Sequence, residues 1–234
     1  MASIDAIINR QLLRWELEKK QATEKPAAKA PPPQVVTVSR QAGSRGTFLA
    51  SRLADELGFT RLHRETIDAI CQTSGYRRRI VENLDERFRG DLDVMVEGMI
   101  TGQSVDHGDY ARHLFQVVLS MARLGGVVLV GRGGNFILGP RRGFHIRVVA
   151  PREQRIVNLV TYKSVTREVA ASEADRVDRE RKELIAKLFD RDIDDPRHYD
   201  LVINLAFIEL EAMVEPTIAA IRSKLARLAA MGEE

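Results

Sequence analysis

A short loop containing two glycines and two arginines joins an apolar segment to an amphipathic one. It reads SRQAGSRGT and occupies residues 39–47. Gly43 and Gly46 permit positive φ, which lets successive backbone N–H groups curve around an anion. A helix that begins near Thr47 would direct its free N–H groups and the positive end of its dipole at the same place. The pattern predicts a phosphate-binding loop, and the alternative is an ordinary strand-to-helix turn.

This loop lacks the lysine of the common pattern GxxxxGK[ST], in which lysine reaches the outer phosphates and the hydroxyl reaches Mg²⁺. Aligned from its end, the loop has Arg45 in the lysine position and Thr47 in the hydroxyl position, but it is one residue short. Aligned from the strand, Arg40 takes the first glycine position, Gly46 the lysine position and Phe48 the hydroxyl position. Both registers remain open. The predicted phosphate-binding residues are Ser39, Arg40, Gly43, Ser44, Arg45, Gly46 and Thr47, with Thr47 also the candidate ligand of Mg²⁺.

A second glycine-rich turn, GRGG at residues 131–134, follows the apolar run VVLV. An arginine at such a position can make a bidentate contact to phosphate or read the edge of a base. Gly131 and Gly133 leave room for a ligand to approach the backbone. We therefore expect Gly131, Arg132 and Gly133 to bind substrate, although an arginine in a salt bridge at a strand end would look the same.

Residues 172–192 are densely charged at helical spacing. Asp178 and Arg181 lie three positions apart and so share one face of the predicted helix. Arginines of this helix, together with Arg155 at the start of the preceding one, would stabilise a phosphoryl group in transfer. The catalytic candidates are Arg45, Arg155, Asp178 and Arg181. A run of charges is also typical of a helix that is merely solvated.

The segments around these residues alternate between strand-like and helix-like patterns, which predicts a parallel sheet covered by helices. In such a sheet ligands bind outside the carboxyl ends of the strands, where both turns would lie. We expect strands at 35–38, 126–131, 144–151 and 200–205, and helices at 47–58, 65–73, 110–124, 151–160 and 208–228. Residues 74–109 read as a charged and partly irregular stretch.

The N-terminal residues form a separate unit. Apolar residues recur at helical spacing up to Trp15, and we expect a helix over 1–21. Residues 22–33 are rich in Pro, Ala and Lys, which predicts an extended linker to a domain spanning 34–230. The helix either packs on its own domain or mediates self-association or partner binding with Trp15 as an anchor.

Composition narrows the class of protein. The formal net charge is +3 and charged residues make up 29% of the 234 residues, so the surface lacks the strong positive charge of a nucleic-acid-binding protein. Cys71 is the single cysteine, no histidine has metal-ligand spacing, and no apolar run reaches the roughly 20 residues that cross a bilayer. We expect a cytoplasmic protein with a small-molecule substrate and without membrane partners.

Taken in order, several segments resemble the cytidylate-kinase-like family of P-loop kinases. They are VTVSRQAGSRG, LASRLADELGF, VENLDER, VVLVGRGGNFIL, RVVAPREQRI, DRERKELIAKLF and DDPRHYDLVINL, which together span residues 35–228. The resemblance implies a three-layer α/β/α fold of the nucleoside-monophosphate-kinase type, with ATP at the first loop. It also implies a CMP acceptor beneath an insert at 74–109 and a lid at 164–195.

The resemblance assigns roles to single residues. Arg132 corresponds to the arginine of the family's Gly-Arg-Asp turn, which contacts the acceptor. Asp178 and Arg181 match its Asp-x-x-Arg lid, and Arg155 matches a helix arginine. The chain departs from the family at Gly133 and at His63, where aspartates are usual. A subgroup of the family carries SRxxGSGG loops without lysine, so the resemblance places this loop in that subgroup.

These observations favour phosphoryl transfer from ATP, with Mg²⁺, to a nucleoside monophosphate or a related small phosphate acceptor. The alternative function is a non-catalytic module that senses a nucleotide or an anion and signals through the N-terminal helix.

Overall fold

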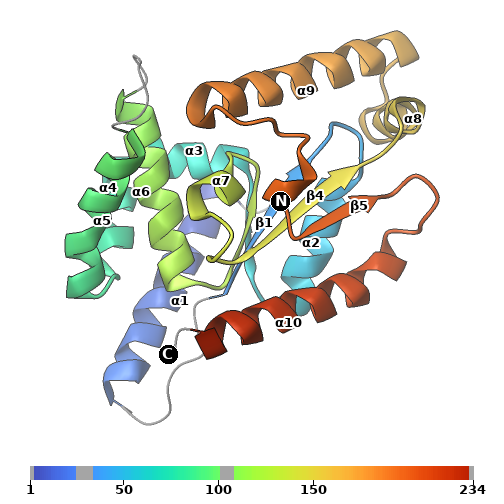
Figure 1. Ribbon diagram of the computed structural model, residues 1–234. Helices are drawn as coiled ribbons and strands as arrows, with labels where there is room; N and C mark the ends of the chain where they lie inside the picture. Colours follow the sequence, from blue (N-terminus) through green and yellow to red (C-terminus); the bar gives the residue numbers. More distant parts are fainter. Residues whose placement is uncertain (1–2, 25–33, 101–107, 232–234) are drawn as a thin grey trace.

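The computed structural model describes residues 3–24, 34–100 and 108–231. Its centre is a five-stranded sheet in the order β2-β3-β1-β4-β5, and every pair of neighbouring strands is parallel. Figure 1 shows the sheet between layers of helices, a three-layer α/β/α arrangement as predicted. The strands are β1 (Val35–Arg40), β2 (Thr60–Leu62), β3 (Val127–Val130), β4 (Phe144–Val149) and β5 (Leu201–Asn204).

Alternate residues of the strands face opposite layers, as the pleat requires. On one side of the sheet, Val36, Val128 and Ile146 pack with the helices α2 (Gly46–Leu57) and α10 (Val214–Met231). On the other side, Val35 and Leu129 pack with a larger group of helices. That group comprises α1 (Ile4–Glu24), α3 (Arg64–Gln72), α4 (Ser74–Glu82), α5 (Glu86–Ile100), α6 (Gly108–Leu124) and α7 (Gly134–Leu138).

The two remaining α-helices lie above the carboxyl ends of the strands. α8 (Arg152–Lys163) and α9 (Arg167–Phe189) share a small apolar core with Ala42 of the loop that follows β1. Figure 1 shows α9 crossing the top of the molecule over β1 and β4. Two short 3₁₀ helices, Pro196–His198 and Glu211–Met213, flank β5. The sequence pattern alone had indicated four strands, and it did not resolve the short edge strand β2.

The stretch over 74–109, expected to be partly irregular, is more regular than the sequence indicated, because α4 and α5 are helices that cover most of it. Their buried apolar residues are few, namely Ile80, Leu92 and Val96. Since charged residues surround these positions, the helical period is hard to see in the sequence. Residues 101–107 lie outside the described part of the chain.

The helix α1 packs on its own domain. Ile8, Leu12 and Trp15 are buried in the core, where α1 packs beside α3 and α4, and Trp15 Nε1 donates to the carbonyl of Gly125 at 2.9 Å. The alternative in which Trp15 anchors a partner is therefore wrong for that side chain, while self-association through other residues of α1 stays a prediction. Of the predicted linker, 25–33 lie outside the described residues.

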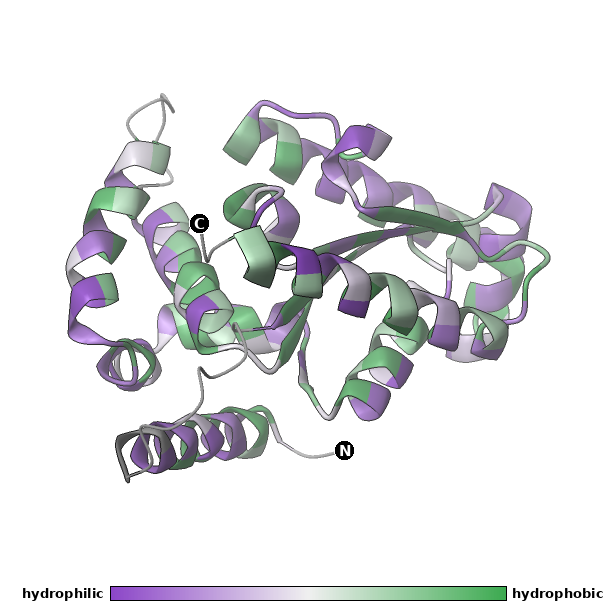
Figure 2. Ribbon diagram, turned by 60° about the horizontal axis from the view of Figure 1, so that its bottom comes forward, coloured by the Kyte–Doolittle hydropathy of each residue, from purple (hydrophilic) through white to green (hydrophobic). Residues whose placement is uncertain are grey.

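Figure 2 shows that most helices carry both hydrophobic and hydrophilic residues, as expected for helices with one buried face. Within the described segments, no helix is both long and apolar enough to span a membrane.

Candidate functional site

A cavity of about 400 Å³ lies at the carboxyl ends of β1 and β3, beneath α9. We call it the large cavity. Three predicted arginines, Arg40, Arg132 and Arg181, line it together, whereas Arg45 and Arg155 do not; the predicted residues Ser39, Gly131 and Gly133 line it too. The full lining is Thr37, Val38, Ser39, Arg40, Arg64, Glu65, Gly131, Arg132, Gly133, Gly134, Asn135, Phe136, Glu173, Arg176, Val177, Glu180, Arg181, Leu184, Ile185 and Ile193.

Arg40 ends β1 and extends its guanidinium group across the cavity floor toward Gly131. A Cβ at Gly131 would lie 2.8 Å from Arg40 Nη1, so a side chain at this position would have to displace the guanidinium group. The Nε atom of Arg40 is buried and has no hydrogen-bond partner. Burial, followed by repulsion from Arg181, lowers the pKa of Arg40 to about 9. A buried cation without an acceptor is unfavourable, and an anion bound beside it would remove the cost.

Arg132 is held by two residues that the sequence did not point to. Asp68 of α3 accepts from Arg132 Nε at 2.7 Å and from Nη2, which makes a bidentate pair. The hydroxyl of Tyr110 on α6 donates to the same carboxylate at 2.9 Å, and burial raises the pKa of Tyr110. Arg132 itself has φ of 55°, an unfavourable conformation for a residue with a side chain. Arg132 therefore forms the salt bridge that was the alternative to substrate binding, and it also lines the large cavity.

The loop after β1 is held in place by contacts from α9. Asp178 of α9 accepts from the backbone N–H of Ala42 at 2.8 Å, and its other oxygen pairs with Arg155 at 2.6 Å. Arg181 donates to Asp178 at 3.3 Å and to the carbonyl of Arg40 at 2.8 Å. The helix α9 therefore rests directly on the loop, and the Asp178 carboxylate accepts from one of the loop N–H groups.

Arg155 and Arg45 lie elsewhere. Arg155 is buried and donates to the carbonyls of Ala150 and Ala42, which places it behind the loop rather than in a cavity. Arg45 adopts φ of 65° just before α2, and its guanidinium lies 3.9 Å from the carboxylate of Glu209. Of the two loop arginines, the structure thus brings Arg40, and not the side chain of Arg45, to the large cavity.

The backbone N–H groups at the start of α2 remain available. No acceptor in the described chain takes the N–H groups of Arg45, Gly46 or Thr47. Ser44 is buried and its hydroxyl donates to the carbonyl of Gln41, so this side chain closes the loop on itself. The Thr47 side chain is exposed. Among the described residues, no group of three or more His, Cys, Asp or Glu side chains is arranged to hold a metal ion.

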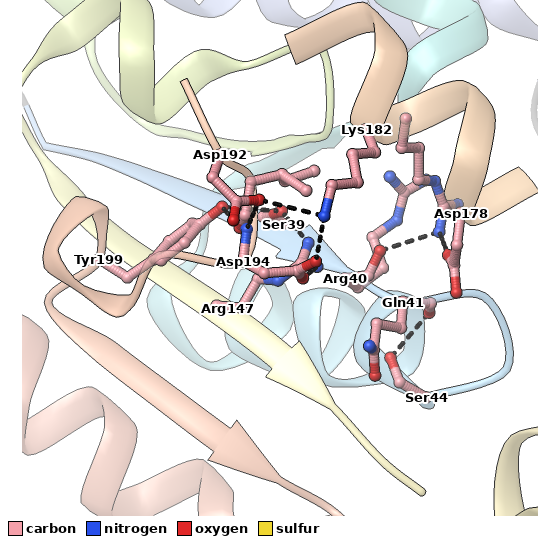
Figure 3. Close-up of polar contacts among 12 residues, drawn as sticks. Ser39, Arg40, Gln41, Ser44, Arg147, Asp178, Lys182, Asp192, Asp194 and Tyr199 are labelled. Atoms are coloured by element: carbon pink, nitrogen blue, oxygen red, sulfur yellow. Dashed lines mark hydrogen bonds and ion pairs between the residues drawn. The ribbon is translucent and has the colours of Figure 1, made fainter. Parts of the chain in front are cut away.

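A second cavity, of about 250 Å³, adjoins the first beneath α9; we call it the small cavity. Figure 3 shows the polar contacts around it. Ser39 and Arg147 are direct partners in the β1–β4 ladder, and Arg147 donates from Nη1 to the Ser39 hydroxyl at 2.7 Å. Tyr199 lies with its ring 6.0 Å from the Arg147 guanidinium. Sequence reasoning missed Arg147, although the alternation of apolar and polar residues in FHIRVV was a signal that one face of this strand is polar.

Comparisons with known proteins show which family this chain resembles. The family model described as "cytidylate kinase-like family" matches residues 35–206. Cytidylate kinase of Ignicoccus hospitalis is 27% identical over 183 residues, which cover 77% of this chain and 95% of that protein. Uronate isomerase of Corynebacterium glutamicum is 37% identical over 107 residues, which cover 45% of this chain and 20% of that protein, so the chain spans one fifth of its length.

Among solved structures, an uncharacterized protein from Eubacterium ventriosum has a similar fold. It superposes with a TM-score of 0.63 at 18% identity and covers 81% of this chain and 98% of its own.

Proposed function

Because this chain belongs to the cytidylate kinase-like family, we propose that it transfers a phosphoryl group from ATP to a nucleoside monophosphate such as CMP, or to a related small phosphate acceptor. The observation that supports the proposal is the convergence of Arg40, Arg132 and Arg181 on the large cavity. Phosphoryl transfer depends mainly on positioning and charge neutralisation, and it needs no nucleophilic side chain. Three guanidinium groups around one cavity supply that neutralisation.

In this proposal each residue has a defined task. Arg132 binds the phosphate of the acceptor, while Arg40 and Arg181 neutralise the group in transfer between the two substrates. The N–H groups of Arg45, Gly46 and Thr47 bind the donor phosphates at the start of α2. Arg40 supplies the charge that a loop lysine would otherwise supply, and Arg155 positions the loop and Asp178.

The Thr47 hydroxyl fits a role in holding Mg²⁺. It is exposed at the N-terminus of α2, beside the N–H groups that would bind the donor phosphates. Mg²⁺ commonly takes one or two protein oxygens and completes its shell with phosphate oxygens and water, so a full cage of carboxylates is not needed. The ion would neutralise charge on the transferred phosphate.

The experiment is a coupled assay of ATP consumption with CMP, UMP, dCMP and AMP as acceptors. We expect turnover that depends on one of these acceptors and on Mg²⁺. Tight ATP binding without any acceptor-dependent turnover would rule out the kinase and leave the alternative, a nucleotide-sensing module. If no nucleotide raises the melting temperature, both proposals fail.

One contact favours the alternative function, a module that senses a nucleotide without catalysis: Asp178 already accepts from the N–H of Ala42. A regulatory protein needs two states, and a carboxylate that competes with phosphate for a loop N–H provides a difference between them. In that case nucleotide binding would change the accessibility of α9, and limited proteolysis would detect the change.

Asp68→Asn tests the acceptor side of the large cavity. Because the variant weakens the bidentate pair that orients Arg132, we expect the KM for the acceptor to rise about tenfold, with kcat changed much less. Steady-state kinetics at varied acceptor concentration measure the two parameters separately. Asp91→Asn on α5, which removes the same charge from an exposed residue, is the matched control. A fall in kcat with unchanged KM would contradict the assignment of Arg132 to the acceptor.

A further inference from the structure

The small cavity is enclosed mainly by cationic side chains. It touches Arg40 and Arg181, which it shares with the large cavity, and it extends from there to β4. Its lining is Arg40, Gln41, Arg147, Asp178, Arg179, Arg181, Lys182, Ile193 and Asp194. Five of these residues carry positive charge and two carry negative charge, so the cavity has an excess of positive charge.

Arg147 is the most unusual member, because it is an arginine inside the sheet with only 5% of its surface exposed. Its Nη1 donates to Ser39 and its Nη2 donates to Asp194 at 2.6 Å, but its Nε atom is buried without any partner. A guanidinium group has five N–H donors. The protein contacts therefore leave most of the donors of Arg147 unused.

Arg40 shows the same deficiency. Its Nε is the other buried guanidinium nitrogen of the described chain without a partner. Buried polar groups nearly always find partners, and an unmade hydrogen bond costs about 1–3 kcal/mol. Both arginines also line the small cavity, so two cations with unmade hydrogen bonds stand beside a space that an anion can occupy.

The two carboxylates of the cavity do not provide this acceptor. Asp178 is engaged by the N–H of Ala42 and by Arg155 and Arg181. Asp194 pairs with Arg147 and lies 3.5 Å from the ammonium group of Lys182. Lys182 in turn lies 3.5 Å from Asp192, as Figure 3 shows. Neither carboxylate contacts the guanidinium of Arg40.

We propose that the small cavity is a phosphate subsite, in which Arg147 and Lys182 bind a phosphate dianion together with Arg40. The positive charge that a loop lysine would supply then comes from Arg40 on β1, Arg147 on β4 and Lys182 on α9. The ligand chemistry is shared by free inorganic phosphate and by the phosphate chain of a nucleotide. Only the second source rests on the proposed phosphoryl transfer.

The test is titration of the full chain with inorganic phosphate, pyrophosphate and ATP in a phosphate-free chloride buffer. Calorimetry measures the affinity, and the melting temperature gives a second readout. Lys182→Ala is expected to weaken phosphate binding about tenfold, since it removes a charge-assisted contact. Lys187→Ala, an exposed lysine of α9 outside both cavities, is the matched control and should bind as the parent protein does.

Arg147→Lys keeps the charge but replaces the planar guanidinium group, whose two Nη atoms reach Ser39 and Asp194 separately, by one compact ammonium group, and we expect a loss of about tenfold or more. Because Arg147 is buried, thermal unfolding without phosphate checks that this variant folds. Lys182 has a side chain that is 57% exposed, so Lys182→Ala keeps the test decisive if Arg147→Lys does not fold.

The outcomes separate the possibilities. Competition between ATP and phosphate identifies the phosphate chain of the nucleotide as the ligand, and independent binding of the two identifies free phosphate; either supports the subsite. No saturable binding of phosphate, pyrophosphate or ATP overturns it, as does phosphate binding that Lys182→Ala and Arg147→Lys leave unchanged. Phosphate binding that depends on Lys182, in a protein without acceptor-dependent turnover, would refute the proposed kinase and leave the subsite standing.

Discussion

Arg40→Met is expected to lower kcat/KM for phosphoryl transfer by about 100- to 1,000-fold and, at the same time, to raise the melting temperature. The loss follows because a preorganised cation facing the transferred group is worth about 3–4 kcal/mol in the transition state. The gain follows because the parent protein buries the Arg40 Nε without a partner, next to the like charge of Arg181. Replacing such a group by an apolar side chain of similar length stabilises proteins by about 1 kcal/mol or more, which corresponds to roughly 2–4 °C in a domain of this size.

Steady-state kinetics and thermal unfolding of the same preparation measure both effects. Arg222→Met, at an exposed position of α10, removes the same charge far from both cavities and should change neither quantity appreciably. If Arg40→Met lowers the melting temperature as well as the activity, then Arg40 contributes to the fold, and its placement as a substitute for the loop lysine is wrong. Activity that survives the substitution would leave the missing charge to the lid arginines.

The same residue shows why part of this site could be anticipated from sequence. The order of an apolar run, a glycine-containing loop and an amphipathic helix depends on local backbone chemistry, so the β1–loop–α2 unit was predictable. The sequence did not show which of the two loop arginines, Arg40 or Arg45, points into the cavity. The two side chains differ in direction because Arg45 adopts a left-handed conformation before α2, whereas Arg40 is the last residue of a strand.

Other site contacts join residues far apart in the sequence. Arg132 and Asp68 are 64 positions apart, and Ala42 and Asp178 are 136 apart. Periodicity within a segment cannot report such pairs, since they depend on how α3 and α9 pack over the strand ends. The glycine-rich turn and the charged run brought Arg132, Asp178 and Arg181 into consideration, and the resemblance to a family assigned them roles. The partners Asp68 and Tyr110 and the strand residue Arg147 came only from the structure.

The helix α9 and the loop after β1 pack directly on each other. Within this contact, some arginines offer free donors to a ligand and others hold the loop in place. Arg40 and Arg147 each have a buried Nε–H without an acceptor. Arg155, in contrast, donates to backbone carbonyls at Ala150 and Ala42 and to the carboxylate of Asp178. A change to either arginine of the first pair should alter anion binding, and for Arg40 we expect it to do so with a gain in stability. A change to the contact between loop and α8 should do the opposite, and the most sensitive point of that contact is a glycine.

Gly43→Ala is expected to destabilise the protein by about 3 kcal/mol and to lower the melting temperature by about 6–12 °C. Gly43 has φ of 75°, and a Cβ at this position would lie 2.3 Å from the carbonyl oxygen of Arg155 and 3.0 Å from Cγ of Leu159. The first contact is with the backbone of α8, which cannot move without breaking the hydrogen bond from Asn158 Nδ2 to the Gly43 carbonyl. Thermal and denaturant unfolding give the two values.

Gly58→Ala separates the two causes, because Gly58 has φ of 65° but nothing within 4 Å of the added methyl group. It carries only the cost of the left-handed conformation, about 1 kcal/mol, or roughly 2–4 °C. We expect Gly43→Ala to lose ATP affinity as well, since the displaced loop no longer aligns the N–H groups of residues 45–47 with the phosphates, whereas Gly58→Ala retains it. Equal destabilisation by the two variants would mean that the loop and α8 can move apart to admit the added methyl group. The loop would then also be free to adjust around a ligand.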